Sequence, residues 1–263
     1  MASGIDMGIA GRTALVTGSS EGLGKACAQA LSRCGVTVVV NGRDAKKLEG
    51  AANEIRKATG GEIVLAPGDV TTEEGRAAIV KASPKIDILV NNAGGPPPGD
   101  FRTWDEDTWL KALRGNMLYA VFMTNAVMDH MIEQRWGRVI NITSQAVKMP
   151  MPLIGLSTSA RAGLTGYMGT IAREVAQYGV TVNNLLPGFF ETKRLRQYLE
   201  SVAATRNVSA DDVAAERAAA NPSRRAGHPD EFGAWCAFIA SAHSGYMTGQ
   251  NILLDGGSYP GVL

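Results

Sequence analysis

Residues 13–24, TALVTGSSEGLG, join an apolar run to a glycine-rich turn. The apolar run predicts a buried strand, and residues 22–34 have the pattern of an amphipathic helix. Gly18, Gly22 and Gly24 therefore lie between a strand and a helix. Glycines at such a junction let the backbone turn tightly and approach a pyrophosphate, whose charge the free N–H groups of the helix would bind. The stretch predicts a nucleotide-binding loop, although tight turns also use glycine where nothing binds.

The same alternation of apolar runs and helical patterns continues along the chain. The further apolar runs lie at 36–42, 62–70, 86–94, 137–144, 180–188 and 250–257, and the helical patterns at 22–34, 44–59, 72–82, 105–135, 157–178 and 229–241. Runs that are apolar on both faces are typical of central strands in a parallel sheet covered by helices. The sequence predicts an α/β fold, a Rossmann-type doubly wound parallel sheet of about seven strands with helices on both faces.

The length of 263 residues suits a single nucleotide-binding domain, so we expect one domain over 1–263. Residues 189–228 interrupt the alternation with two polar, alanine-rich helical patterns. They predict a small helical flap over the carboxyl ends of the strands, where it would cover a substrate. A merely solvated pair of helices is the alternative.

Composition excludes several classes of function. The 26 basic and 25 acidic residues are spread along the chain and argue against binding to nucleic acid or to a membrane surface. No segment approaches the ~18 apolar residues of a membrane span. Cys27, Cys34 and Cys236 are odd in number and lack metal-ligand spacing, so we expect buried, reduced thiols and no metal site. We therefore expect a cytoplasmic protein that acts on a small molecule.

The second apolar run ends in NGRD, residues 41–44, and bears on the choice of nucleotide. An NAD site usually has an acid here for the ribose hydroxyls. Gly42 offers none, whereas the guanidinium of Arg43 can pair with a 2′-phosphate. Asp44 is a suitable N-cap for the next helix, and Glu21 would lie unfavourably close to such a phosphate. The pattern favours NADP(H) over NAD(H).

Six motifs together give the chain a family resemblance. They are TGSSEGLG (17–24), GDV (68–70), NNAG (91–94), Asn116 in RGNMLYAVF, Ser144 in INITS and PGFFET (187–192). With them the chain resembles the short-chain dehydrogenase/reductase family, from Gly11 to the MTGQNILLDGGS stretch near its end, and most of all the classical beta-ketoacyl reductases. The resemblance implies a homo-oligomer, either a dimer or a tetramer.

The resemblance also implies roles for individual residues. Ser144 would polarise the substrate oxygen, and Asn116 would organise a proton-relay water. Asp69 would lie near the adenine and Thr192 near the nicotinamide carboxamide. The full set of expected cofactor-binding residues is Gly18, Ser20, Gly22, Leu23, Gly24, Arg43, Asp69, Val70, Asn92, Ala93, Gly94, Pro187, Gly188 and Thr192.

One motif of the family is altered. Its proton donor is a tyrosine thirteen residues after the serine, followed four residues later by a lysine, and these two positions hold Ser157 and Arg161. A serine hydroxyl is shorter than a phenol and a far weaker acid. Arg161 preserves the positive charge but keeps its proton, so it would not join a proton relay as lysine does. We expect both residues in the active site, with altered roles.

Three explanations of the altered motif remain open. Lys148 or Tyr198 could supply the proton, the substrate could be an imine or activated alkene that needs little acid help, or the protein could bind the nucleotide without turnover. Because Asn116 and Ser144 are retained, the sequence favours an NADP(H)-dependent oxidoreductase that reduces a carbonyl by hydride transfer with a non-tyrosine proton donor.

Overall fold

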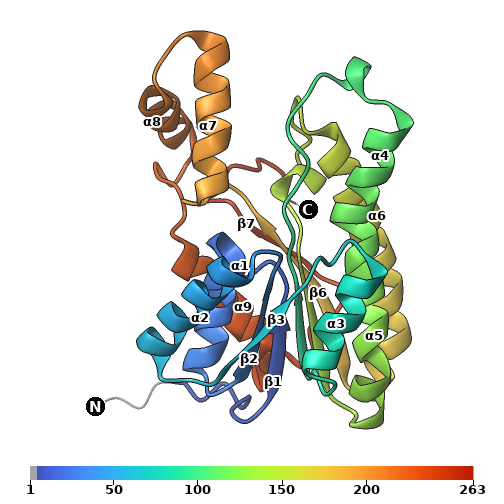
Figure 1. The fold of residues 1–263 in the computed structure, drawn as a ribbon. Coiled ribbons are helices and arrows are strands. Elements are labelled where there is room, and N and C mark those ends of the chain that lie inside the picture. Colours follow the sequence, from blue (N-terminus) through green and yellow to red (C-terminus); the bar gives the residue numbers. More distant parts are fainter. Residues whose placement is uncertain (1–4, 263) are drawn as a thin grey trace.

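The computed structural model describes residues 5–262, and in these residues seven strands form one sheet (Figure 1). The strand order is β3-β2-β1-β4-β5-β6-β7 and every pair is parallel. The strands are β1 (Thr13–Val16), β2 (Thr37–Gly42), β3 (Ile63–Pro67), β4 (Ile88–Asn91), β5 (Gly137–Ile142), β6 (Val180–Pro187) and β7 (Asn251–Leu254). The chain moves outward from β1 to β3 and returns beside β1 at β4, so a ligand crevice is expected at the ends of β1 and β4.

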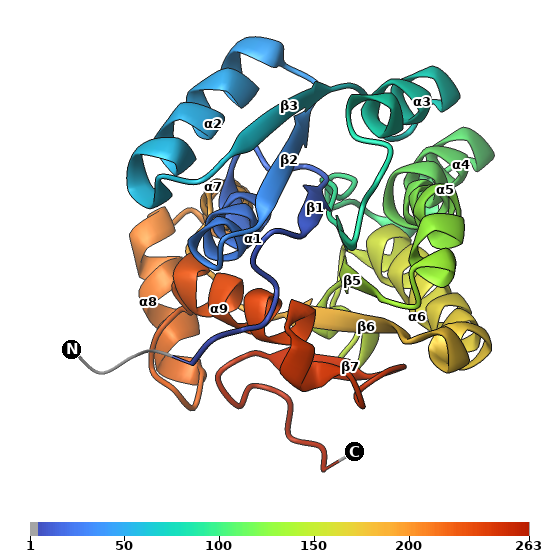
Figure 2. The same cartoon turned by 90° about the horizontal axis from the view of Figure 1, so that it is seen from below.

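Helices cover both faces of the sheet, as Figure 2 shows from below. Their bounds are α1 (Gly22–Arg33), α2 (Ala45–Thr59), α3 (Glu73–Ala82), α4 (Glu106–Leu113), α5 (Tyr119–Glu133), α6 (Gly155–Val175), α7 (Lys193–Arg206), α8 (Ala210–Ala220) and α9 (Pro229–Ala240). On one face α1, α2 and α9 enclose a core that includes Leu31, Leu48 and Phe232. On the other, α3, α5 and α6 enclose a second core that includes Met123 and Leu164. The predicted doubly wound architecture is confirmed.

The predicted positions of the strands and helices agree closely with the structure. Each predicted apolar run contains a strand, and the predicted helix ends agree with the structure within a few residues. Asp44 caps α2 as predicted, since its carboxylate accepts a hydrogen bond from the Lys47 N–H at 3.0 Å. The predicted helix over 105–135 is different: a π-helical turn at Arg114–Leu118 divides it into α4 and α5. Such a turn carries one extra residue, which shifts the face that a side chain presents, and here it contains Asn116.

The two helices of residues 189–228 pack on each other and stand at the end of the sheet where the strands point (Figure 1). Leu199, Ala203 and Val213 form a small core between α7 and α8. Thr192 caps α7, and Ser209 caps α8 in a reciprocal capping box with Asp212. The pair is therefore a compact unit with its own apolar contacts.

Residues 5–262 contain neither a membrane-spanning helix nor a disulfide bond. None of the helices there is long and apolar enough to span a bilayer. All three cysteines are free; Cys27 and Cys236 are buried as expected, but Cys34 is only half-buried.

A ladder of asparagine side chains crosses the carboxyl half of the sheet. The amide of Asn91 donates to Asn141 at 3.0 Å, that of Asn141 to Asn184 at 3.0 Å, and that of Asn184 to Asn251 at 2.8 Å. These residues are directly paired in the register of β4 to β7. The first three are buried, so their polar atoms need partners within the protein, and the ladder supplies them together with Thr124, to which the Asn91 amide also donates at 3.2 Å. The ladder fixes these strands relative to each other immediately before the loops that follow them.

We predict that Asn141→Ala destabilises the protein by about 2–4 kcal/mol, because the Asn91 amide and the Asn184 oxygen each lose a buried partner. Urea unfolding followed by circular dichroism measures the change. Asn53→Ala is the matched control, since Asn53 is exposed on α2 and should shift the free energy of unfolding by less than about 0.5 kcal/mol. Equal effects of the two substitutions would show that the ladder contributes nothing.

Candidate active site

The glycine loop after β1 is held against the loop after β4. The side-chain amide of Asn92 donates to the Gly18 carbonyl at 2.9 Å, and the Asn41 side chain accepts from the Gly18 N–H at 3.2 Å. A Cβ on Gly24 would lie 2.5 Å from the Gly18 carbonyl oxygen, so only glycine allows this turn. Gly18 and Gly22 have the positive φ values of 56° and 58° that a side chain would disfavour. These glycines form a close-packed turn between β1 and α1.

The first helix begins without a side-chain cap. Glu21 occupies the N-cap position of α1 and makes no capping hydrogen bond, whereas side chains cap α2, α3, α4, α7, α8 and α9. Leu23, in the first turn, packs against the core. The uncapped N–H groups and the helix dipole of α1 fit a phosphate group of a dinucleotide.

Charges around the end of β2 fit a nucleotide with a 2′-phosphate. Glu21, which appeared unfavourable for this phosphate, forms an ion pair with Lys47 at 2.7 Å. The Ser20 hydroxyl lies 3.4 Å from the position of a Cβ on Gly42. Arg43 is exposed at the same strand end. Arg43 and Ser20 could therefore meet a phosphate while the Glu21 carboxylate is paired with Lys47.

Asp69 and Val70 follow β3, next to these residues. Partial burial opposes ionisation of Asp69, but hydrogen bonds from the Thr71 N–H and hydroxyl, at 2.9 and 2.8 Å, and the charge of Arg43 hold its pKa below the usual value. The carboxylate is therefore ionised at neutral pH. Val70 is buried and offers an apolar wall, so the pair suits the adenine position that the family resemblance implies.

Ser144 lies at the carboxyl end of β5 with its hydroxyl oxygen anchored. The oxygen accepts a hydrogen bond from the Ala146 N–H at 3.1 Å. Within residues 5–262 the Ser144 hydroxyl donates to no group in return. Its proton is therefore available to an oxygen atom of a ligand.

Ser157, Asn116 and Arg161 form one hydrogen-bonded chain. The sequence predicted that all three lie in the active site, but not that they bond to one another. The Ser157 hydroxyl donates to the Asn116 side-chain oxygen at 3.2 Å and accepts from Arg161 Nε at 3.1 Å. The Asn116 amide in turn approaches the Gly94 carbonyl at 3.5 Å. Because its proton is directed at Asn116, Ser157 is not placed as a proton donor to a substrate.

The guanidinium of Arg161 is buried and held by backbone carbonyls. Nη1 donates to Ile142 at 2.7 Å and to Thr143 at 3.1 Å, and Nη2 donates to Ala93 at 3.4 Å. Burial lowers the pKa of Arg161, as does the positive charge of Arg194. The ordinary pKa of an arginine side chain is nevertheless so high that Arg161 stays protonated. The site therefore contains a fixed positive charge that is satisfied by dipoles rather than by an acid.

The two alternative proton donors lie in different surroundings. The Lys148 ammonium is 5.7 Å from the ring centre of Tyr259. Tyr198 belongs to the α7–α8 unit, where its ring packs near the Arg217 guanidinium at 5.1 Å. Neither makes a hydrogen bond to Ser144, Ser157 or Arg161 in the described residues.

Sequence reasoning missed two residues at this site. Tyr119, one turn beyond Asn116, is buried; burial raises its pKa to about 12 against the opposing effect of the Arg161 charge, so it keeps its proton at neutral pH. Arg194 on α7 donates to the Gly95 and Pro96 carbonyls at 3.2 and 3.1 Å. A signal for Arg194 was available, because a basic residue in the first turn of a helix opposes the dipole and indicates another purpose.

The loop after β6 closes the cofactor side of the site. Pro187 ends the strand, and a Cβ on Gly188 would lie 2.7 Å from the orphaned, buried side-chain oxygen of Gln145. The Thr192 methyl group lies 3.7 Å from the position of a Cβ on Gly22. A cavity of about 250 Å³ is lined by Gly22 and Thr192 together with Lys25, Ala26, Gln29, Glu191, Lys193, Pro229 and Asp230. The glycine loop and the 187–192 loop thus meet at this cavity.

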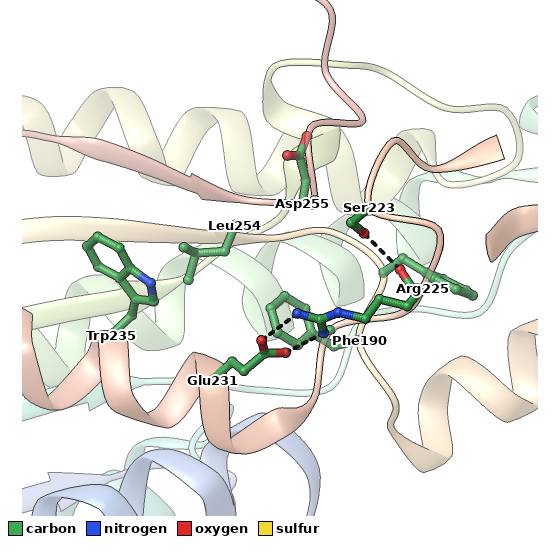
Figure 3. A pocket seen from close by; sticks show the side chains of 10 residues that line it. Phe190, Ser223, Arg225, Glu231, Trp235, Leu254 and Asp255 are labelled. Atoms are coloured by element: carbon green, nitrogen blue, oxygen red, sulfur yellow. Dashed lines mark hydrogen bonds and ion pairs between the residues drawn. The ribbon is translucent and has the colours of Figure 1, made fainter. Parts of the chain in front are cut away.

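A second cavity, of about 170 Å³, lies on another side of the 187–192 loop (Figure 3). Its lining residues are Phe189, Phe190, Ser223, Arg225, Gly227, Glu231, Trp235, Leu254, Asp255 and Gly256. Arg225 and Glu231 face each other across it at 2.6 Å, and the hydrogen bonds from Arg225 lower the pKa of Glu231 to about 2. None of the predicted site residues lines this cavity, and its main charges neutralise each other.

Comparisons with known proteins agree with this geometry. The short chain dehydrogenase family model matches residues 12–202. The chain is 34% identical over 251 residues to a 3-oxoacyl-[acyl-carrier-protein] reductase of Synechocystis, covering 94% of this chain and 96% of that protein. It is 32% identical over 257 residues to the uncharacterized oxidoreductase YvaG of Bacillus subtilis, covering 95% and 97%.

Among solved structures, L-sorbose reductase from Gluconobacter frateurii, complexed with NADPH and L-sorbose, superposes with a TM-score of 0.93 at 25% identity. The match covers 98% of this chain and all of the other. The family match, the two relatives and this fold all lead to one assignment: the chain belongs to the short-chain dehydrogenase family of oxidoreductases.

Proposed function

We propose that the protein is an NADP(H)-dependent reductase that adds hydride to the carbonyl carbon of a ketone, of the 3-oxoacyl type or similar, without a tyrosine proton donor. The observation that carries the proposal is the state of Ser144. Its oxygen is anchored by Ala146 while its proton has no acceptor in residues 5–262. A hydroxyl held in this way can donate to a carbonyl oxygen and bind it more strongly as negative charge develops there.

The residues of the glycine loop and the three strand ends would hold the cofactor. The uncapped N-terminus of α1 would receive the pyrophosphate, and Arg43 with Ser20 would receive the 2′-phosphate. Ion pairing of Glu21 with Lys47 supports NADP(H) over NAD(H). The reductase of Gluconobacter that binds NADPH supports the same choice. When bound, NADPH supplies the hydride.

The proton would come from water rather than from a positioned side chain. The Ser157 proton is committed to Asn116, and Arg161 stays protonated. Because serine is shorter than tyrosine, Ser157 and Asn116 would offer their polar groups to a water in place of a phenol ring. The fixed charge of Arg161 would stabilise the substrate oxygen until that water protonates it.

The available proton of Ser144 also favours a second candidate, the reduction of an imine or of an alkene conjugated to a carbonyl. An iminium substrate already carries its proton. Hydride addition to such an alkene leaves an enolate, which the Ser144 hydroxyl and the Arg161 charge can stabilise without prior protonation. A protein that binds NADP(H) without turnover is the third candidate. Such a role would not use the available proton of the Ser144 hydroxyl.

We further propose that the protein acts as a homo-oligomer. Trp235 and Phe238 are exposed side by side on α9, with their ring centres 6.1 Å apart. An exposed aromatic pair of this kind supports contact with a second copy.

We predict that Arg43→Gln weakens NADPH binding about 10- to 100-fold and leaves NADH binding unchanged, because only NADPH has the phosphate that Arg43 would meet. Quenching of protein fluorescence by each nucleotide measures the dissociation constants. Lys57→Gln, an exposed change at the far end of α2, is the control and should alter neither. Equal losses for both nucleotides would contradict a 2′-phosphate role for Arg43.

We predict that the protein oxidises NADPH in the presence of a short 3-oxoacyl thioester or a simple diketone, and that Ser144→Ala lowers kcat about 100-fold or more. The double substitution Ser157→Tyr/Arg161→Lys should raise kcat by less than the roughly 100-fold that a positioned general acid contributes. Absorbance of NADPH follows the reaction, and thermal unfolding confirms that each variant is folded.

Two results would contradict the proposal. If only the double variant were active, the scaffold would be competent but the reaction of the protein itself would be different, or its role would be binding. If Ser144→Ala retained full activity, the anchored hydroxyl would not be the group that binds the substrate oxygen.

A further inference from the structure

Arg194 connects the α7–α8 unit to the loop between β4 and α4. It lies in the first turn of α7, two residues beyond Thr192. Its two terminal nitrogens donate to the carbonyls of Gly95 and Pro96 at 3.2 and 3.1 Å. In Figure 1 these two segments rise on opposite sides above the end of the sheet. The side chain therefore spans from the helical pair to the loop on the other side of the site.

The tip of this side chain lies next to Ser157. A Cβ placed on Gly95 would be 2.9 Å from Arg194 Nη2 and 3.4 Å from the Ser157 hydroxyl oxygen. The guanidinium and Ser157 thus face the same small volume, and the absence of a side chain at Gly95 makes this approach possible. Through Ser157 that volume adjoins Asn116 and Arg161.

The charge of Arg194 has no counterion. In residues 5–262 neither Arg194 nor Arg161 forms an ion pair with a carboxylate. Elsewhere on the same helix the arginines are paired: Arg196 with Asp211 at 2.5 Å, and Arg206 with Glu216 at 2.7 Å. Among the three arginines of α7, Arg194 is therefore the one without a carboxylate partner in residues 5–262.

The surroundings of the Arg194 charge are electrostatically unfavourable. Although the Arg194 residue as a whole is exposed, packing around its guanidinium lowers its pKa, and its charge in turn acts on Arg161. Two like charges in one partly desolvated space repel each other, and the first turn of a helix adds a third positive contribution. A bound carboxylate would relieve all three, and it matches the fork of N–H donors that a guanidinium presents.

We propose that Arg194 is a specificity-determining residue that selects oxo acids, substrates in which the reducible carbonyl and a carboxylate belong to the same small molecule. The proposal rests on the reductase function proposed above. The ketone oxygen would accept the Ser144 proton, and the carboxylate would bind the guanidinium of Arg194. Arg161 remains tied to backbone carbonyls and contributes its charge from behind Ser157.

The test uses matched pairs that differ only in charge: pyruvate, acetoacetate and levulinate, each against its methyl ester. Calorimetry measures binding of each compound to the complex of the protein with NADP⁺, in which no reduction can occur. We expect at least one acid to bind about ten-fold or more tightly than its ester, and Arg194→Gln to abolish this preference by weakening only the acid, about 10- to 100-fold.

Arg206→Gln, at the other end of α7, is the matched control and should leave the preference for the acid intact. The affinity of each variant for NADPH is measured alongside. Equal binding of acids and esters by the unaltered protein would overturn the proposal. Equal weakening of acid and ester binding in Arg194→Gln would also overturn it, because Arg194 would then only hold the helical pair in place. A loss of NADPH affinity in this variant would overturn it too, because the Arg194 charge would then belong to a cofactor phosphate.

Turnover of NADPH with the same compounds separates this inference from the proposed function. Selective binding of an acid without turnover would support the role of Arg194 and count against the reductase reaction. Turnover of ketones with no preference between acid and ester would support the reductase reaction and overturn the role of Arg194.

Discussion

The buried charge of Arg161 is the constraint on which the candidate site depends. A guanidinium without a carboxylate partner is costly to bury unless its hydrogen bonds are satisfied. Three backbone carbonyls satisfy it, one from the loop after β4 and two from the end of β5. Those loops and the first turn of α6 are thereby held together. Because Arg161 also donates to Ser157, the hydroxyl of Ser157 turns its proton to Asn116.

Because of this constraint, the hydroxyl and the charged groups of the site would have different roles. Ser144 is the hydroxyl whose proton remains available, and it lies at the end of β5, a strand that the asparagine ladder fixes to its neighbours. In the proposed reaction the positive charge of Arg161 would replace part of what a tyrosine does, since charge stabilises an oxyanion without transferring a proton. On this proposal, the preferred substrates would be those whose reduced form tolerates slow protonation by water.

Much of this could be predicted from the sequence, because periodicity and glycine placement are local signals. The strands, the helices and the glycine loop agree with prediction, as does the proximity of Ser157 to Arg161, one helical turn apart. The direction of the Ser157 proton could not be predicted, since it depends on a π-helical turn that reorients Asn116. The position of Arg194 could not be predicted either, because its contact with Gly95 joins segments 99 residues apart.

Transfer of deuterium from NADPH labelled at C4 tests the central claim most directly, with a ketone and a conjugated enone of the same skeleton supplied together. Mass spectrometry and NMR of the products locate the label. The account predicts one deuterium on the former carbonyl carbon of the ketone and the same result in a variant lacking the Ser157 hydroxyl. Label only on the alkene carbon of the enone, or no label in any product while NADPH still binds, would contradict it.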